Sequence, residues 1–309
     1  MRAGFYTLGC KVNQYETQLM REALQNRGYD IVEIDDYPDV FIINSCTVTE
    51  ESDRKTRSTV RKIRKKLPDS VIVLTGCVPQ AFPSVANELE MADIVIGNAS
   101  NADLPEYLDR FFIDRQRIID INPHKKENVN ATISGFESRT KAFMKIQDGC
   151  DRFCTYCIIP YARGRIRSKP IEDITAEVRS LADRGHREVV LIGINLTAYG
   201  TGDGVDIADA VKAAASVEGI ERVRLGSLEP DMMTDEIIEK MAKIDKLCPQ
   251  FHLSLQAGCD KTLKRMNRHY DTEFYRNIVN KLRKSFKWCS ITTDIMVGFA
   301  GESDEDFEQ

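Results

Sequence analysis

Short apolar runs rich in β-branched residues alternate with helical patterns along most of the chain, and this alternation limits the folds that it can adopt. In the first third, four such runs are predicted as strands: Phe5–Leu8, Val40–Asn44, Val71–Thr75 and Ile94–Gly97. Between two of them, Thr56, Val60, Ile63 and Leu67 recur at steps of four, three and four, the spacing of one helix face. Strand–helix alternation of this kind predicts a doubly wound parallel sheet.

The alternation resumes after a polar stretch. Residues 122–139 contain few large apolar side chains and are predicted as a linker between domains at residues 1–121 and 140–309. Five further strands are expected: Ala142–Gln147, Glu188–Ile194, Arg222–Ser227, Phe251–Leu255 and Ile291–Val297. Five βα units in series predict a partial (β/α) barrel, so the fold class is α/β throughout. Because the chain stops at Gln309, just after a helix start, we expect the barrel to be truncated there.

Length and composition indicate a cytoplasmic protein without membrane segments. The 309 residues suffice for about two domains. No signal segment opens the chain, and no apolar run approaches the roughly 20 residues that span a bilayer. In such a chain the nine cysteines favour metal or redox chemistry over disulfides. The net charge of −5 does not indicate nucleic-acid binding, so any RNA contact has to come from local basic patches.

Three cysteines within eight residues form the most specific pattern in the sequence. We call Cys150, Cys154 and Cys157 the loop cysteines. A structural zinc site takes four ligands, whereas a cubane iron–sulfur cluster on three cysteines keeps one iron open, and that iron can bind S-adenosylmethionine. With Tyr156 before the last cysteine, the spacing resembles the signature of the radical S-adenosylmethionine enzymes. A partial zinc knuckle is the alternative, but no nearby His or Cys completes it.

Three other cysteines are far apart in the sequence, yet each directly follows a predicted strand. We call Cys10, Cys46 and Cys77 the strand-end cysteines. Because the carboxyl ends of parallel strands lie along one edge of a sheet, these thiols are expected to converge. Gly9 and Gly76 would let the backbone turn tightly beside a bulky ligand. Three structural thiols are the alternative, but these would lie within strands, so a second three-cysteine cluster is favoured.

Six segments together resemble the methylthiotransferases, which attach a methylthio group to RNA or protein. They are TLGCKVNQYET (7–17), NSCTVT (44–49), TGC (75–77), QDGCDRFCTYCIIPYARG (147–164), GINLTAYG (193–200) and LSLQ (253–256). Within the family, KVNQY (11–15) and YARGRIR (161–167) most resemble the branch that acts on N6-threonylcarbamoyladenosine next to the tRNA anticodon. The last barrel strand and the C-terminal RNA-binding domain of the family are missing, in keeping with the expected truncation.

The resemblance implies S-adenosylmethionine and two [4Fe–4S] clusters as cofactors. The cluster on the loop cysteines would cleave S-adenosylmethionine to a 5′-deoxyadenosyl radical, because the unactivated hydrogen on carbon 2 of adenine requires radical chemistry. The cluster on the strand-end cysteines would hold a methylated sulfur and deliver it. The implied partners are tRNA and an electron donor such as a flavodoxin or ferredoxin, and the protein is expected to be a monomer.

Polar residues at the predicted ends of the barrel strands are candidates for binding S-adenosylmethionine. Asn195, Glu229, Gln256 and Asp294 lie there and could bind its amino, carboxylate or ribose groups, while Tyr156 is expected to orient the adenine. Each of the four also has an ordinary alternative as the polar cap of a strand or loop.

Basic residues beside the loop cysteines are candidates for binding RNA. Arg163, Arg165 and Arg167 follow the loop directly and are predicted to contact phosphates. The segment 54–66 holds eight basic residues, which a solvated helix face explains equally well.

Other functions are weighed against this one. The same chemistry could act on isopentenyladenosine in tRNA or on an aspartate of a ribosomal protein. A non-catalytic iron–sulfur electron carrier or scaffold is the alternative from another class. Such carriers usually close the fourth iron position with a cysteine and need no polar strand ends, so both features favour an enzyme.

Overall fold

The predicted strands fold into two parallel arrangements, one in each of two units of the computed structural model. The structure describes residues 1–124, 131–136 and 140–309. Among these, the first unit holds residues 1–124, Ala131–Ile133 and Ile158–Gly164, and the second unit holds the remainder. This division differs from the expected domains in one respect, because Ile158–Gly164 groups with the first unit although it follows the loop cysteines. Half of the predicted linker, residues 125–130 and 137–139, lies outside the described residues.

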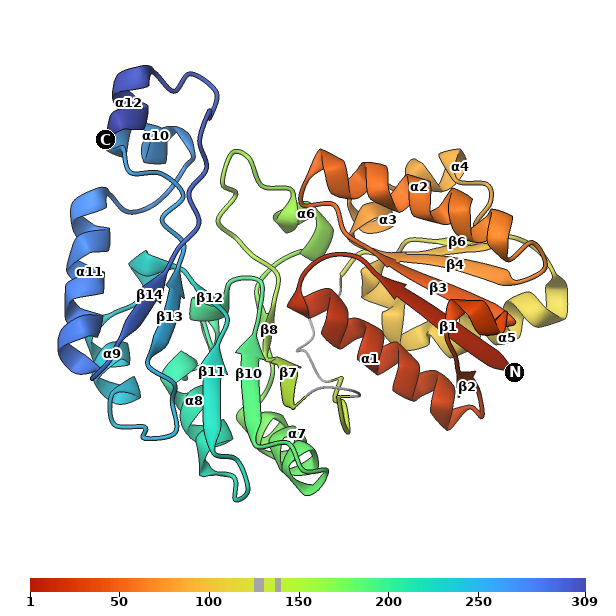
Figure 1. Ribbon diagram of the computed structural model, residues 1–309, viewed down its shortest axis with the longest axis horizontal. Coiled ribbons are helices and arrows are strands. Elements are labelled where there is room, and N and C mark those ends of the chain that lie inside the picture. Colours follow the sequence, from red (N-terminus) through yellow and green to blue (C-terminus); the bar gives the residue numbers. More distant parts are fainter. Residues whose placement is uncertain (125–130, 137–139) are drawn as a thin grey trace. The chain divides into compact units, whose positions relative to one another are not determined.

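The first unit is built on a six-stranded parallel sheet (Figure 1). In spatial order its strands are β2 (Asp30–Ile31), β1 (Arg2–Thr7), β3 (Val40–Ser45), β4 (Val71–Gly76), β5 (Ile94–Ile96) and β6 (Ile118–Asp120). The four strands predicted for this region are confirmed. The edge strands β2 and β6 escape prediction, since two or three residues are too few to show a periodicity.

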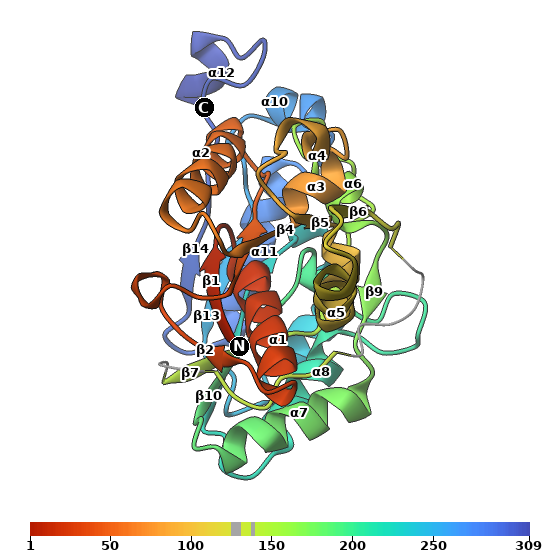
Figure 2. The same ribbon diagram turned by 90° about the vertical axis from the view of Figure 1, so that its right-hand side faces the viewer.

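Helices cover both faces of this sheet, which makes the fold doubly wound (Figures 1 and 2). On one face, α1 (Lys11–Asn26) and α5 (Leu104–Asp114) share a core with Ile42, and on the other, α2 (Glu50–Lys66) shares a core with Ile43. Neighbouring strand residues point to opposite faces, so both faces of β3 are apolar. The short helices are α3 (Cys77–Ala81), α4 (Val85–Glu88), α6 (Ile159–Arg163), η1 (Ile34–Asp36) and η2 (Asn98–Asp103).

The second unit contains two three-stranded parallel sheets, as a partial barrel predicts. Their strands are, in spatial order, β11 (Arg222–Leu225), β10 (Glu188–Ile192) and β7 (Lys141–Lys145), then β12 (Ser227–Leu228), β13 (Gln250–Leu253) and β14 (Ser290–Thr292). The five predicted barrel strands are confirmed. An antiparallel pair, β8 (Gln147–Asp148) and β9 (Arg167–Ser168), flanks the loop cysteines in the chain.

Helices connect these strands. They are α7 (Ile171–Asp183), η3 (Leu196–Ala198), α8 (Ile207–Ser216), η4 (Pro230–Met232), α9 (Asp235–Met241), α10 (Asp260–Arg265), α11 (Thr272–Ser285) and α12 (Asp304–Glu308). The buried residues of α7 include Ile174, Val178 and Leu181, the stripe expected from the sequence. Within the described part of the chain, no helix is both long and apolar enough to cross a membrane.

Charged side chains are buried beside the barrel core. Lys169 and Glu177 form an ion pair in which neither side chain is exposed to solvent. Burial lowers the pKa of Lys169, and the charge of Glu177 opposes this shift. The backbone at Lys169 is also fixed, because its N–H donates to the Ile146 oxygen at 2.7 Å and its carbonyl accepts from the Tyr199 hydroxyl at 2.6 Å. The pair therefore joins α7 to the segment that follows β9.

We predict that Lys169→Met alone destabilises the protein by about 3–5 kcal/mol, because it removes the cation that pairs with the buried Glu177 carboxylate. Adding Glu177→Leu removes both charges and is expected to restore most of the loss. Chemical denaturation followed by circular dichroism measures both variants against Lys264→Met, which replaces an exposed lysine. Equal stability of the single and double variants would contradict this account of the pair.

Candidate active site

The strand-end cysteines lie at one edge of the sheet in the first unit. Cys10 precedes α1 directly, Cys46 follows the last residue of β3, and Cys77 is the first residue of α3 after β4. The three preceding strands are neighbours in the parallel sheet. A Cβ atom on Gly9 would lie 2.7 Å from the Cys46 Cβ, so the chain before Cys10 touches Cys46. The charges of Cys10 and Cys46 each raise the pKa of Cys77, as expected for thiols along one edge of a sheet.

Two buried asparagines hold the strand-end cysteines in place. The Asn13 Nδ2 donates to the Ser45 carbonyl at 2.8 Å, next to Cys46, and the Asn13 Oδ1 lies 3.5 Å from the Cys10 thiol. The Asn98 Nδ2 lies 3.7 Å from the Cys77 sulfur and donates to the Ala162 carbonyl at 3.0 Å. The spacing of Asn13, three residues after Cys10 at a helix start, could have revealed its role, whereas nothing in the sequence near Asn98 points to Cys77.

The position of Arg163 corrects its assignment as an RNA ligand. Its side chain is 1% exposed and forms an ion pair with Glu16 in the first unit. Its Nη2 also donates to the Asn13 Oδ1 at 2.9 Å. A guanidinium enclosed in this way cannot reach a phosphate on the surface. The charge of Arg163 is instead balanced by a carboxylate that lies 147 positions away in the sequence.

Arg163 acts electrostatically on the strand-end cysteines. Burial raises the pKa of Cys77 to about 11, and the Arg163 charge opposes this shift. Burial likewise raises the pKa of Cys46, and Arg163 is again among the groups that lower it. A metal ligand must be a thiolate, and a nearby cation favours that charged form. Arg163 therefore makes the buried thiols better ligands than burial alone would allow.

The loop cysteines form a second group, in the second unit. Burial raises the pKa of Cys150, and the charges of Cys157 and Cys154 add to the shift, so the three sulfurs lie close together. The Cys157 N–H donates to the Cys154 carbonyl at 2.9 Å. Gly149 and Phe153 both have positive φ, at 77° and 50°. These two positive φ angles lie on either side of Cys150, in the loop that carries the three cysteines.

The predicted S-adenosylmethionine contacts differ in position. Asn195 and Glu229 both lie beside the loop cysteines: the Asn195 Nδ2 is 4.0 Å from the Cys150 sulfur, and Glu229 is ion-paired with Arg268, which itself donates to the Cys154 sulfur. Gln256 has a positive φ of 70° and bridges to Ile295 in the next strand segment.

The other two predicted contacts of S-adenosylmethionine are Asp294 and Tyr156. The Asp294 side chain is 79% exposed and lies 3.5 Å from the His252 ring. Tyr156 lies between the last two loop cysteines in the chain, and its ring meets Phe299 edge to face at 6.3 Å. Burial raises the pKa of Tyr156 to about 12, so its hydroxyl stays protonated.

Arg167 needs the same correction as Arg163, whereas Arg165 does not. The Arg167 side chain is 9% exposed and lies 3.6 Å from the Asp148 carboxylate, which also binds Lys145 at 2.9 Å. Arg165 is 71% exposed and forms an ion pair with Asp151 at 3.1 Å. Of the three predicted RNA contacts, only Arg165 is accessible to a phosphate.

Each cysteine group supplies three thiols, the number that a cubane with one open iron requires. Among the described residues, no three Cys, His, Asp or Glu side chains are arranged to hold a single metal ion. A cubane has separate irons, so each thiolate binds a different one. Beside the loop cysteines, the buried Asn195 Oδ1 has no hydrogen-bond partner within the described residues. An unsatisfied acceptor there suits the amino group of a bound S-adenosylmethionine.

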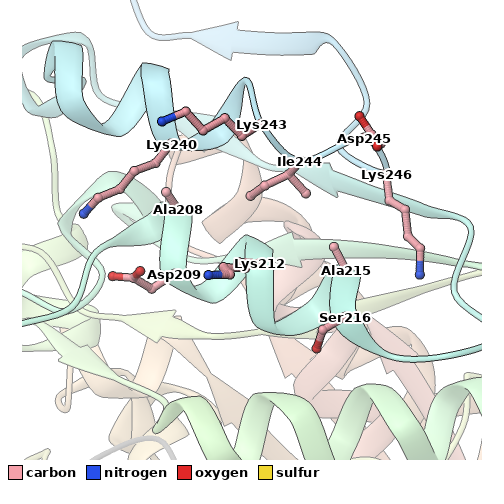
Figure 3. A pocket seen from close by; sticks show the side chains of 10 residues that line it. All are labelled: Ala208, Asp209, Lys212, Ala215, Ser216, Lys240, Lys243, Ile244, Asp245 and Lys246. Atoms are coloured by element: carbon pink, nitrogen blue, oxygen red, sulfur yellow. The ribbon is translucent and has the colours of Figure 1, made fainter.

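A cavity of about 480 Å³ in the second unit lies between α8 and the turn after α9 (Figure 3). Four lysines line it: Lys212, Lys240, Lys243 and Lys246. Lys240 already binds Asp206 at 2.8 Å and Glu236 at 3.0 Å, and Lys246 donates to the Val217 carbonyl at 3.2 Å. None of the predicted site residues lines this cavity.

Comparison with solved structures supports the fold. The cobalamin-dependent S-adenosylmethionine radical enzyme OxsB matches with a TM-score of 0.67 and 11% identity, over 96% of this chain and 49% of that one. The radical S-adenosylmethionine methyltransferase TsrM from Kitasatospora setae matches with a TM-score of 0.66 and 13% identity, over 95% of this chain and 67% of that one. At these identities the likeness concerns the arrangement of the chain alone.

Comparison with protein families and curated proteins identifies the family. Residues 144–309 match the Radical SAM superfamily, and residues 2–97 match Uncharacterized protein family UPF0004. The threonylcarbamoyladenosine tRNA methylthiotransferases MtaB of Bacillus subtilis and Aquifex aeolicus are 38% and 37% identical over 98% and 100% of this chain, which covers 68% and 76% of their lengths. The tRNA-2-methylthio-N(6)-dimethylallyladenosine synthase of Clostridium tetani is 36% identical over 98% of this chain and 69% of its own length. This chain therefore belongs to the radical S-adenosylmethionine methylthiotransferases, enzymes that use S-adenosylmethionine and a [4Fe–4S] cluster.

Proposed function

We propose that this enzyme converts N6-threonylcarbamoyladenosine in tRNA to its 2-methylthio derivative, using one [4Fe–4S] cluster on the loop cysteines and another on the strand-end cysteines. The observation that carries the proposal is the presence of two three-cysteine groups, one at neighbouring strand ends of the first unit and one in a loop of the second. Three relatives named for this nucleoside are 37–39% identical to the chain. Relatives named for dimethylallyladenosine are 35–36% identical, so that substrate is the second candidate.

The residues around the loop cysteines would bind and orient S-adenosylmethionine. When bound, a reduced [4Fe–4S] cluster supplies the electron for its reductive cleavage. The Asn195 Oδ1 is free to accept a hydrogen bond from the amino group. The backbone of Glu229 is held by the Thr197 hydroxyl, which accepts from its N–H at 2.7 Å. The Tyr156 ring stays neutral and presents an aromatic face to the adenine.

The residues around the strand-end cysteines would keep a second cluster bound. When present, that cluster supplies an open iron for the sulfur that is transferred. Asn13 links the Cys10 and Cys46 segments, and Asn98 meets Cys77. Arg163, which favours the thiolate forms of Cys46 and Cys77, lies only six residues after the last loop cysteine in the chain. A single short segment thus carries a ligand of one cluster and a supporting cation of the other.

The tRNA backbone would meet exposed cations, above all those that lack a carboxylate partner. On α2, Arg54, Arg57, Arg64 and Lys66 are engaged in ion pairs with acidic side chains. Arg61, Lys62 and Lys65 on the same helix are exposed, and no ion pair involves them within the described residues. Such cations release counterions when they bind phosphates. We therefore assign the RNA contact to these three residues, with the exposed Arg165 as a fourth.

We predict that the anaerobically reconstituted protein binds about eight irons, in two cubanes. Replacing all three loop cysteines by Ala should halve the iron and abolish 5′-deoxyadenosine formation. Replacing all three strand-end cysteines should also halve the iron but leave 5′-deoxyadenosine formation intact while methylthiolation stops. Iron analysis and chromatography of the nucleoside products test both variants. Full iron content in either variant would show that its cysteines are not cluster ligands.

Mass spectrometry of tRNA nucleosides from cells with and without the gene tests the substrate. Loss of the gene should abolish 2-methylthio-N6-threonylcarbamoyladenosine and leave the unmodified N6-threonylcarbamoyladenosine to accumulate. A plasmid copy should restore the modified nucleoside, and a copy without the loop cysteines should not. Loss of the methylthio derivative of dimethylallyladenosine instead would assign the enzyme to the other tRNA branch.

Tight RNA binding should depend on the exposed cations of α2 and not on the buried arginine. For the triple variant Arg61→Gln, Lys62→Gln, Lys65→Gln, the slope of log affinity against log salt should flatten by about one unit for each lost contact. Arg163→Gln should keep the slope and lower the melting temperature, since it breaks a buried ion pair. Filter binding across a salt series measures the slopes. A flatter slope for Arg163→Gln and an unchanged slope for the triple variant would instead show that Arg163 contacts the RNA.

A further inference from the structure

One arginine that no motif includes lies against a ligand of the radical site. The Arg268 side chain is 4% exposed, and its Nη1 donates to the Cys154 sulfur at 3.3 Å. Its Nη2 forms an ion pair with Glu229, and its Nε donates to the Tyr270 hydroxyl at 2.9 Å. Its guanidinium also lies 4.9 Å from the centre of the Tyr270 ring. All of these groups belong to the second unit.

The backbone around Arg268 is tied to the loop that carries the cysteines. The Asn267 side chain donates to the Arg152 and Phe153 carbonyls, both at 3.2 Å. The Thr155 N–H donates to the Met266 carbonyl at 3.1 Å. Cys154 thus lies between two anchored neighbours, and the guanidinium points at its sulfur in a fixed orientation. An arginine that served only to neutralise Glu229 would need none of these links.

A hydrogen bond from a cation to a ligand sulfur has a defined effect on an iron–sulfur cluster. Reduction adds one negative charge to the cluster, and a positive donor at the sulfur stabilises that charge. The effect is large where water is excluded, because a buried charge is poorly screened. The Glu229 carboxylate works in the opposite direction, since it cancels part of the guanidinium charge. The electrostatic potential at the Cys154 sulfur therefore depends on the opposite charges of Arg268 and Glu229.

We propose that Arg268 is a positioning residue that raises the reduction potential of the cluster on the loop cysteines, and that Glu229 limits this increase. The inference rests on the proposed function, because it requires that cluster to be present. Arg268 makes the cluster easier to reduce before it transfers an electron to S-adenosylmethionine. The same guanidinium holds the Glu229 carboxylate directly after β12. The reduction potential of the cluster and the position of Glu229, a candidate contact of S-adenosylmethionine, therefore both depend on Arg268.

The test is a potentiometric titration of the reduced cluster, followed by electron paramagnetic resonance. It is done in protein whose strand-end cysteines are replaced by Ala, so that only one cluster contributes. Arg268→Gln should lower the reduced-to-oxidised ratio at a fixed applied potential about tenfold, a shift of about 59 mV for one electron. Glu229→Gln should shift the ratio in the opposite direction. Arg276→Gln is the matched control, since this exposed arginine of α11 belongs to neither site and should leave the ratio unchanged.

Two further variants keep the test decisive if Arg268→Gln loses its cluster. Arg268→Lys keeps a cation but not the fork that reaches Cys154 and Glu229 together, so the potential should fall by less than in Arg268→Gln. Tyr270→Phe removes only the hydroxyl that faces Nε and should leave the potential unchanged. An unaltered potential in both Arg268 variants with full iron content would overturn the proposal, as would shifts of the same sign in Arg268→Gln and Glu229→Gln. Absence of iron from the parent protein would instead count against the cluster itself.

Discussion

Parallel pairing of β1, β3 and β4 is the constraint on which the strand-end group depends. Parallel strands end at the same edge of a sheet, so cysteines that closely follow the strands meet there although they are far apart in the sequence. The edge is reinforced by Ser45, whose hydroxyl donates to the Thr75 carbonyl at 2.6 Å and accepts from the Val78 N–H at 3.2 Å. Gly76 is required there, because a Cβ atom would lie 2.4 Å from the Ser45 oxygen.

The cost of burying charge explains the basic segment after the loop cysteines. In the amino-acid sequence alone, this segment resembles a phosphate-binding patch, because it contains Arg163, Arg165, Arg167 and Lys169. Three of them are enclosed, and each enclosed cation has a carboxylate partner: Glu16, Asp148 or Glu177. An unpaired buried charge would cost several kcal/mol, which explains why these three cations are paired. Arg163 belongs to the first unit, and the other three cations belong to the second.

The two cysteine groups meet the same electrostatic problem in a similar way. Burial protects a cluster from water but disfavours the thiolate form that binds iron. At the strand-end group, burial raises the pKa of Cys46 and Cys77, and the charge of Arg163 lowers it. At the loop group, Arg268 donates a hydrogen bond to Cys154. In both places the arginine is itself paired with a glutamate, which keeps the surrounding region close to neutral.

Hydrophobic periodicity and the spacing of residues along the chain determined most of the strands and the pattern of the loop cysteines. The runs at β1, β3, β4 and β5, and the five barrel strands, follow from periodicity within a few residues, and the loop cysteines follow from spacing alone. The convergence of Cys10, Cys46 and Cys77 follows from the strand ends that the sequence predicts. The short edge strands and the partners of the buried charges were decided only by tertiary packing. Glu16 and Arg163 are 147 positions apart, and Cys154 and Arg268 are 114 apart. No local period can specify such a pair, because its geometry exists only when distant segments are packed against each other.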